Sequence, residues 1–108
     1  MYKFNYEINL KIANRVYEDV EKLTEISSNN YELKWKYSPD ILKIEKNNEE
    51  YTISAPIGYC TIGINGNEIS IISGEYMGRK CKAESRLKAN FLQIALRIYS
   101  LKSIGKIA

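Results

Sequence analysis

Apolar and polar residues alternate most clearly over residues 58–72, around the dipeptide Asn65-Gly66. Asn and Gly tolerate the positive φ angles of a tight two-residue turn, so this stretch predicts a β-hairpin. With these two residues as the loop, Ile62 would face Ile69. The face expected to be buried comprises Cys60, Ile62, Ile64, Ile69 and Ile71. A slip of one residue would turn this face over, so the pattern predicts which side meets the core.

A helical spacing follows over about residues 80–102. Large apolar residues recur there at intervals of three and four, as on one side of an amphipathic helix. They are Leu87, Phe91, Ile94, Ile98 and Leu101, and the opposite ridge is Lys82, Arg86, Asn90, Gln93 and Arg97. Burying five large apolar side chains contributes about 1.5–3 kcal/mol each, more than surface charges do. We therefore expect this helix to pack on the core and to turn its basic ridge outward.

The first half of the chain shows the same two periods. Residues 2–10 and 31–37 alternate like strands, whereas residues 11–27 have the spacing of a helix. A second hairpin is expected near Asn47-Asn48, with Ile44 facing Tyr51. A two-residue loop there would also place two glutamates opposite each other, so a four-residue loop is the alternative.

These elements predict an α+β fold in the order β-α-β-β-β-β-β-α. Short connections favour a mainly antiparallel meander of five or six strands, and we expect both helices to pack on one face of the sheet. Length and apolar content predict a single domain over residues 1–108. No apolar run is long enough to span a membrane, so we expect a cytoplasmic protein without membrane contact, in the host cytoplasm if it is viral.

The residue types narrow the chemistry. The chain has no histidine, which removes the commonest general base and every Ser-His or Cys-His nucleophile pair. Its two cysteines, Cys60 and Cys81, lie on different predicted elements and are too few for a zinc site. We expect no metal, no cofactor and no catalytic residues, and the sequence favours a protein that is not an enzyme.

Charge is distributed unevenly along the chain. Residues 1–75 carry eight basic and twelve acidic residues, whereas residues 76–108 carry eight basic residues and one acid. This split indicates an acidic partner, nucleic acid or an acidic protein, for the last third, or a homodimer that pairs unlike patches. The residues expected to bind an anion or nucleic acid are Arg79, Lys80, Lys82, Arg86 and Arg97.

Two alternative sites remain open. Gly74–Lys80 lies between a predicted strand and a predicted helix, the context of a phosphate-binding loop, although its glycine spacing does not match that motif. Arg79, Lys80 and the amide groups of a helix start could still hold an anion. Aromatic residues of two strands could instead line a pocket. They are Tyr2, Tyr6, Tyr31, Trp35 and Tyr37.

One stretch resembles a known family. The segments Gly58–Gly63 and Glu68–Gly78, followed by a helix with Phe91-Leu92 and Tyr99, are similar to the core of a conserved plastid and cyanobacterial reading-frame family of unknown function. This chain lacks the acid expected at Cys60 and the histidine of the last helix. The resemblance implies the order of elements but no activity. In size and composition the chain also resembles small uncharacterised proteins of archaeal viruses.

The leading hypothesis from the sequence is a binding or assembly protein. It would act as a homodimer or through its basic C-terminal loop and helix. The rival hypothesis is an enzyme or a small-ligand or phosphate-binding protein that uses the Gly74–Lys80 loop.

Overall fold

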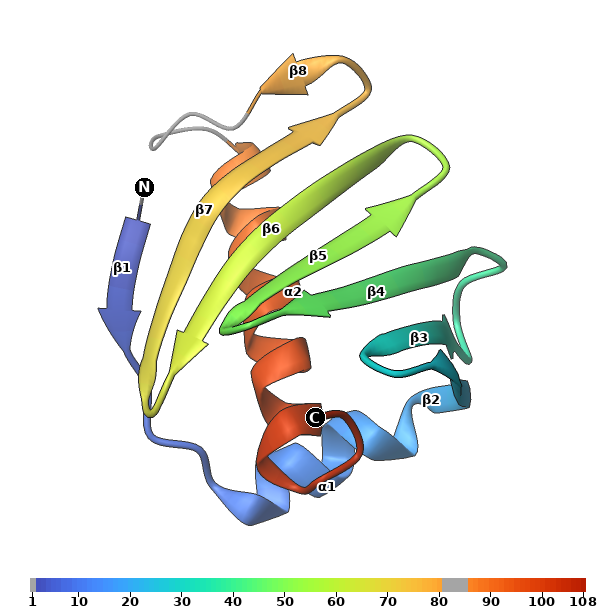
Figure 1. Cartoon of the computed structure of the whole chain (residues 1–108), viewed down its shortest axis with the longest axis vertical. Helices are drawn as coiled ribbons and strands as arrows, with labels where there is room; N and C mark the ends of the chain where they lie inside the picture. The colour runs from blue at the N-terminus through green and yellow to red at the C-terminus, as the bar shows by residue number, and fades with distance from the viewer. Residues whose placement is uncertain (1, 81–85) are drawn as a thin grey trace.

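The computed structural model describes residues 2–80 and 86–108, with the side chains of residues 2–80 and 89–108. These residues form an α+β fold with one antiparallel sheet and two helices (Figure 1). The sheet has eight strands, more than the five or six expected. The strands are β1 (Tyr2–Asn5), β2 (Val20–Ser27), β3 (Asn30–Trp35), β4 (Ile41–Asn47), β5 (Glu50–Ala55), β6 (Gly58–Asn65), β7 (Glu68–Tyr76) and β8 (Arg79–Lys80), and the helices are α1 (Leu10–Glu18) and α2 (Arg86–Ser103).

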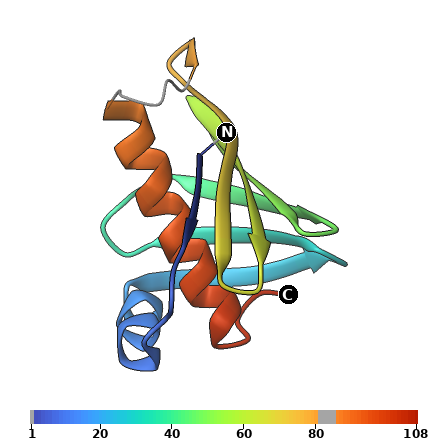
Figure 2. The ribbon, with the colours of Figure 1, turned by 90° about the vertical axis from the view of Figure 1, so that its left-hand side faces the viewer.

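The strands from β2 to β7 form a meander, as the short connections predicted. The order across the sheet is β1-β7-β6-β5-β4-β3-β2. Both β1 and β8 pair with β7, β1 with residues 68–71 and β8 with residues 75–76. Strand direction changes strongly between β7 and β2, so the sheet curls around α2 (Figures 1 and 2). This twist follows from the right-handed twist of each strand.

Both helices lie on the same side of the sheet, as expected (Figure 2). The hairpin face predicted to be buried is buried in full. Gly74 on β7 allows close packing of α2, because a Cβ atom there would lie 2.6 Å from the ring of Phe91. The buried residues of α2 and the chain end are Phe91, Ala95, Ile98, Tyr99, Ser100, Leu101 and Ile107.

The helix predicted over residues 11–27 is wrong beyond Glu18, where α1 ends and β2 follows. A β-bulge explains the misleading spacing. The register of β2 against β3 shifts at Glu21, which is an extra residue on β2. The bulge brings Val20 and Leu23, three positions apart, to the same face of the sheet. This interval of three imitates a helix in the sequence.

The β6–β7 hairpin is present, but its turn begins one residue later than predicted. The loop is Gly66-Asn67, and Ile62 lies opposite Ile71 instead of Ile69. Gly66 adopts the positive φ of 60°, as the first position of a type II′ turn requires. A register change of two residues keeps the same face buried, so the apolar pattern could not distinguish the two registers.

The β4–β5 hairpin differs from its prediction in the same way. Ile44 lies opposite Ile53 instead of Tyr51, and the connecting residues are Asn48-Glu49. Asn48 takes the positive φ, 57°. Glu45 then lies opposite Thr52, which avoids the repulsion between glutamates that either predicted loop would impose.

The segment Gly74–Lys80 is a β-hairpin and not a loop that precedes a helix. Gly74 is buried within β7, and Lys80, expected as the first helical residue, lies on β8. The turn is Met77-Gly78, with φ values of 50° and 79°, the two positive values of a type I′ turn. Helix α2 begins at Arg86, and Cys81 lies outside the described residues.

Candidate functional site

Two of the predicted anion-binding residues lie together on β8. The side chains of Arg79 and Lys80 are both exposed. Across the β7–β8 hairpin, Arg79 lies opposite Tyr76 and Lys80 lies opposite Glu75. Glu75 is a single acid beside two cations, so this hairpin keeps an excess of positive charge.

The other three predicted residues are placed differently. Lys82 lies outside the described residues, and so does the side chain of Arg86. The guanidinium carbon of Arg97 lies 5.3 Å from the ring centroid of Trp35 and 5.4 Å from that of Tyr37. These two rings are nearly parallel, with centroids 6.1 Å apart. Arg97 therefore makes cation–π contacts within the chain.

Arg97 and the β8 pair belong to distant parts of the sheet. Four strands, β4 to β7, separate β8 from β3, which carries Trp35. Neighbouring strands lie about 4.8 Å apart, so the separation along the sheet is about 24 Å. One phosphate group cannot reach both. Binding of an anion by the predicted residues stays a prediction.

The aromatic residues expected to line one pocket are spread over the molecule. Tyr6 contacts Tyr99 of α2 edge-on, with ring centroids 6.1 Å apart. Tyr2 lies on β1, at one edge of the sheet. Tyr31 accepts a hydrogen bond from the backbone of Ala108, and the remaining two rings form the stacked pair under Arg97. These five residues therefore do not surround a single cavity.

Two buried tyrosines hold Ala108. The hydroxyl of Tyr51 donates to the Ala108 carbonyl oxygen at 2.5 Å, and the Ala108 N–H donates to the Tyr31 hydroxyl oxygen at 3.0 Å. Burial raises the pKa of both tyrosines above the usual value of 10.0. They are neutral hydrogen-bonding groups at physiological pH, which suits a structural role.

The two ends of the sheet differ in the character of their turns. Every second connection of a meander lies at the same end, and Figure 1 shows the two groups. The β2–β3, β4–β5 and β6–β7 turns are polar: Ser28-Asn29, Asn48-Glu49 and Gly66-Asn67. We call their location the polar end. The other three connections lie at the opposite end and are residues 36–40, Pro56-Ile57 and Met77-Gly78.

Large apolar side chains are exposed around this second group of turns. We call the location the apolar end, defined by Tyr37, Ile41, Ile57, Tyr59, Tyr76 and Met77. Met77 is 69% exposed and Tyr37 is 57% exposed. Five other large apolar residues are exposed among the described residues, and they are distributed over β1, α1 and β2. More than half of the exposed large apolar side chains of the described residues therefore lie at this one end of the sheet.

Backbone contacts fix two of these turns to each other. The N–H of Met77 donates to the carbonyl oxygen of Ile57 at 2.8 Å. Gly58 lets β6 approach β7 closely, because a Cβ atom there would overlap the carbonyl oxygen of Glu75. Met77 itself has a positive φ, which L-residues other than Asn and Asp seldom adopt. An exposed methionine is thus held in a conformation that costs free energy.

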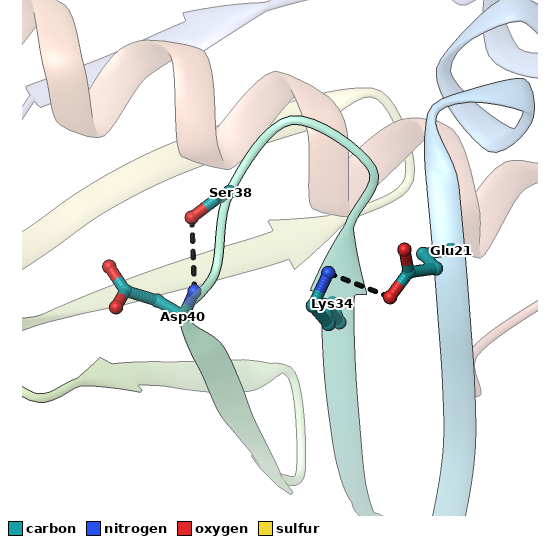
Figure 3. Close-up of polar contacts among 4 residues, drawn as sticks. All are labelled: Glu21, Lys34, Ser38 and Asp40. Atoms are coloured by element: carbon teal, nitrogen blue, oxygen red, sulfur yellow. Dashed lines mark hydrogen bonds and ion pairs between the residues drawn. The ribbon is translucent and has the colours of Figure 1, made fainter.

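The β3–β4 connection is held by its own polar contacts. The hydroxyl of Ser38 accepts a hydrogen bond from the N–H of Asp40 at 3.3 Å (Figure 3). The preceding strand is joined to β2 by an ion pair of 2.7 Å between Lys34 and Glu21 (Figure 3). The first contact lies within the turn, and the ion pair joins the strand before it to β2.

A cavity of about 210 Å³ opens at the apolar end, between the sheet and α2. It lies beside all three connections: Asp40 and Ile57, which belong to two of them, line it, and so does Tyr76, which directly precedes the third. Its apolar walls include Leu42, Ile53, Ala55, Phe91 and Ile94. Ligand sites for small molecules usually measure about 300–1,000 Å³. This cavity is smaller, and its size suits a single large side chain.

Two larger hollows lie elsewhere. One of about 760 Å³ lies at the polar end, where asparagines, glutamates and Lys3 line most of it. The other, of about 620 Å³, lies beside the C-terminal residues 105–108. Among the described residues, no three His, Cys, Asp or Glu side chains are grouped closely enough to hold a metal ion. Neither hollow brings together a recognisable catalytic set.

Comparisons with known proteins give no information on the function of this chain. No protein-family model, no curated protein and no solved structure gives a significant match to this chain. The family resemblance noted from the hairpin therefore stays a prediction. Within the described part of the chain, neither helix has the length and apolar character needed to cross a membrane.

The apolar end was not predicted from the sequence, although the sequence contains one signal of it. Ile57 directly follows Pro56, and Met77 directly precedes Gly78, so large apolar residues occupy two turns. Turns are usually polar. The alternation of a meander places the connections after β3, β5 and β7 at one end. The unpredicted strand β8 hid the third turn, Met77-Gly78, because that segment was expected to be a loop before a helix.

Proposed function

We propose that this protein is a binding module that docks a protein partner at its apolar end. One observation carries the proposal: six exposed large apolar side chains lie on, or within two residues of, three alternate turns of one sheet. Exposed large apolar side chains that gather at one place on a surface are typical of protein interaction sites. The polar turns of the opposite end supply an internal comparison: counted in the same way, they have one such side chain among the described residues, Ile26.

Charge favours an acidic partner. Arg79 and Lys80 are exposed directly beside Tyr76 and Met77. The last third of the sequence carries eight basic residues and one acid, which would attract an acidic surface. A second copy of the chain or a nucleic acid would be alternative partners of the same surface. A phosphate-binding loop loses its support, because Gly74–Lys80 is a hairpin.

The test compares two matched substitutions of exposed isoleucines. Ile57 at the apolar end is 49% exposed, and Ile26 on β2 is 58% exposed. Ile57→Glu is expected to lower the affinity for the partner at least tenfold, because it places a charge in the apolar contact. Ile26→Glu is expected to leave the affinity unchanged.

The measurement is affinity capture from extracts of cells that contain the protein, followed by titration of each captured protein. A protein that wild type and Ile26→Glu retain and Ile57→Glu loses would support the proposal. Equal capture by all three forms would contradict it. Binding only to oligonucleotides, with affinity that falls steeply as salt rises, would instead favour nucleic acid as the partner.

A further inference from the structure

We infer that the partner inserts one large apolar side chain into the cavity between the sheet and α2, and that the segment carrying this side chain has acidic residues on the β8 side. The inference rests on the proposed function and specifies the chemistry of its partner. The occupant is a short extended segment of another protein. The cavity volume, its lining and the charges at its two borders carry the argument.

Volume and lining select the anchor. A cavity of about 210 Å³ accommodates a side chain of the size of Leu, Met or Phe. Phe91 and Ile94 of α2 line the cavity on the helix side, and Ile53 and Ala55 of β5 line it on the sheet side. Interfaces commonly obtain most of their affinity from a few such anchors that fill pockets. A polar side chain would lose its hydration there without gaining partners.

Charged residues at the two borders of the cavity determine the order of charges expected along the bound segment. Arg79 and Lys80 are exposed on β8, at one border. Asp40 lines the cavity at the other border, directly before β4. Glu75 also lines the cavity on the β8 side and lies opposite Lys80, so it offsets one of the two positive charges. A segment that crosses from β4 to β8 therefore meets Asp40 first and the exposed cations of β8, which keep a net positive charge, last. The complementary sequence carries a basic residue, then the apolar anchor, then acidic residues.

The spacing of these groups follows from the sheet. Four strand intervals separate β4 from β8, which at about 4.8 Å each amounts to about 19 Å. An extended chain covers about 3.3 Å per residue. The basic and acidic ends of the segment are therefore about six residues apart, and the strands fan apart at this end, so that six is a lower bound (Figure 1).

The experiment uses synthetic nine-residue peptides with two lysines at one end and two glutamates at the other. The central residue is Leu, Met or Phe, and the matched control has Ser there. Each peptide is made in two versions, one with the lysines at its N-terminus and one with the lysines at its C-terminus. Methyl carbon NMR of isoleucine-labelled protein reports on the cavity through Ile53, Ile57 and Ile94, and on a distant position through Ile26.

We expect saturable shifts at the three cavity isoleucines and none at Ile26. An apolar centre should bind at least tenfold more tightly than serine. Ala55→Leu, which fills the cavity, should abolish this difference, and its melting curve checks that it still folds. Arg79→Glu combined with Lys80→Glu should weaken the glutamate-tailed peptides at least tenfold. Peptides with lysine at both ends should bind wild type more weakly than the glutamate-tailed ones.

Several results would overturn the inference. Equal binding of the leucine and serine peptides to wild type would exclude an anchor in the cavity, whatever the variants do. Shifts that appear on concentrating the protein alone would identify a second copy as the occupant. Shifts caused by oligothymidine and not by any peptide would identify nucleic acid. If Ile57→Glu loses its captured partner but wild type does not prefer apolar peptides, the proposed function survives and the anchor is wrong.

Discussion

Arg97 illustrates how the surroundings of a residue decide its role. The helical spacing placed it on an outward basic ridge, together with Asn90 and Gln93. Those two residues are exposed, but Arg97 lies over the rings of Trp35 and Tyr37. A guanidinium is planar and weakly hydrated, and its long stem can lie along apolar surface. A helical ridge therefore predicts the direction of an arginine but not the partner that it finds.

The buried tyrosines predict a loss of stability at alkaline pH. Burial raises the pKa of Tyr31 and of Tyr51 in the folded protein above 10.0. Below pH 10, both are protonated in the folded and unfolded chain, so their contribution to the free energy of unfolding is constant. As pH rises above 10, the unfolded chain loses these protons first, and the folded state is destabilised. Urea unfolding between about pH 8 and pH 11 measures this decline.

Matched variants identify the source of the decline. Tyr51→Phe removes the hydrogen bond to Ala108 and should lower the free energy of unfolding at neutral pH by about 1 kcal/mol. It should also reduce the alkaline decline. Tyr59→Phe changes an exposed residue and is expected to leave both quantities unchanged. An identical alkaline decline in wild type and in a protein with phenylalanine at both buried positions would contradict the prediction.

At the level of elements, the β7–β8 hairpin combines two demands that conflict. A type I′ turn favours Asn or Gly at its first central position, where this chain has Met77. The exposed side chain of Met77 is well suited to an apolar contact but poorly suited to a positive φ. Functional surfaces often retain such local strain. The Met77 side chain therefore fits the binding proposal better than it fits the turn.

Met77→Asn should separate stability from binding. Asparagine tolerates the positive φ, so the free energy of unfolding should rise by about 1 kcal/mol, and thermal unfolding should shift upward by about 5 °C. The same change removes an apolar side chain from the apolar end and should weaken partner capture. Calorimetry and the capture assay measure the two effects. A variant that is both less stable and equally able to bind would contradict the argument.

The elements also show which errors local patterns produce. Alternation predicted the buried face of the β6–β7 hairpin correctly, because a period of two survives a register change of two. The exact turn was missed, because Asn65-Gly66 and Gly66-Asn67 are both acceptable to a local rule. Residues 20–27 were mistaken for helix, because the bulge at Glu21 changes the spacing of the half-buried, inward-facing residues Val20 and Leu23 from two to three.

In the whole molecule, the C-terminal residues connect parts of the fold that are distant in sequence. Ile107 is 3% exposed and belongs to the core cluster. Ala108 bonds to Tyr31 of β3 and to Tyr51 of β5. Gly105 provides the positive φ of 75° that turns the chain back after α2. The short tail thus ties the end of the helix to the middle of the sheet.

Truncating the buried isoleucine of this tail should therefore destabilise the entire domain. Ile107→Ala is expected to lower the free energy of unfolding by about 2–5 kcal/mol, the usual cost for a buried isoleucine. Ile104→Ala, at a half-buried position in the same segment, should cost less. Urea unfolding monitored by Trp35 fluorescence measures both. Equal losses of free energy of unfolding for the two variants would show that Ile107 does not belong to the cooperative core.

The residue pattern was sufficient to establish the class of fold, the meander, the buried faces of the two predicted hairpins and the inward side of α2 from Phe91 to Leu101, because burial imposes a period that neighbouring residues carry. The side chain of Leu87, the first residue of the predicted stripe, lies outside the described residues. The pattern also located the uneven charge. It could not establish the registers, the bulge on β2 or the cation–π contact of Arg97, because each depends on a partner that is distant in the sequence. The apolar end belongs to this second group. Its six side chains lie in or beside three separate connections, and only the pairing of the strands brings them to one end.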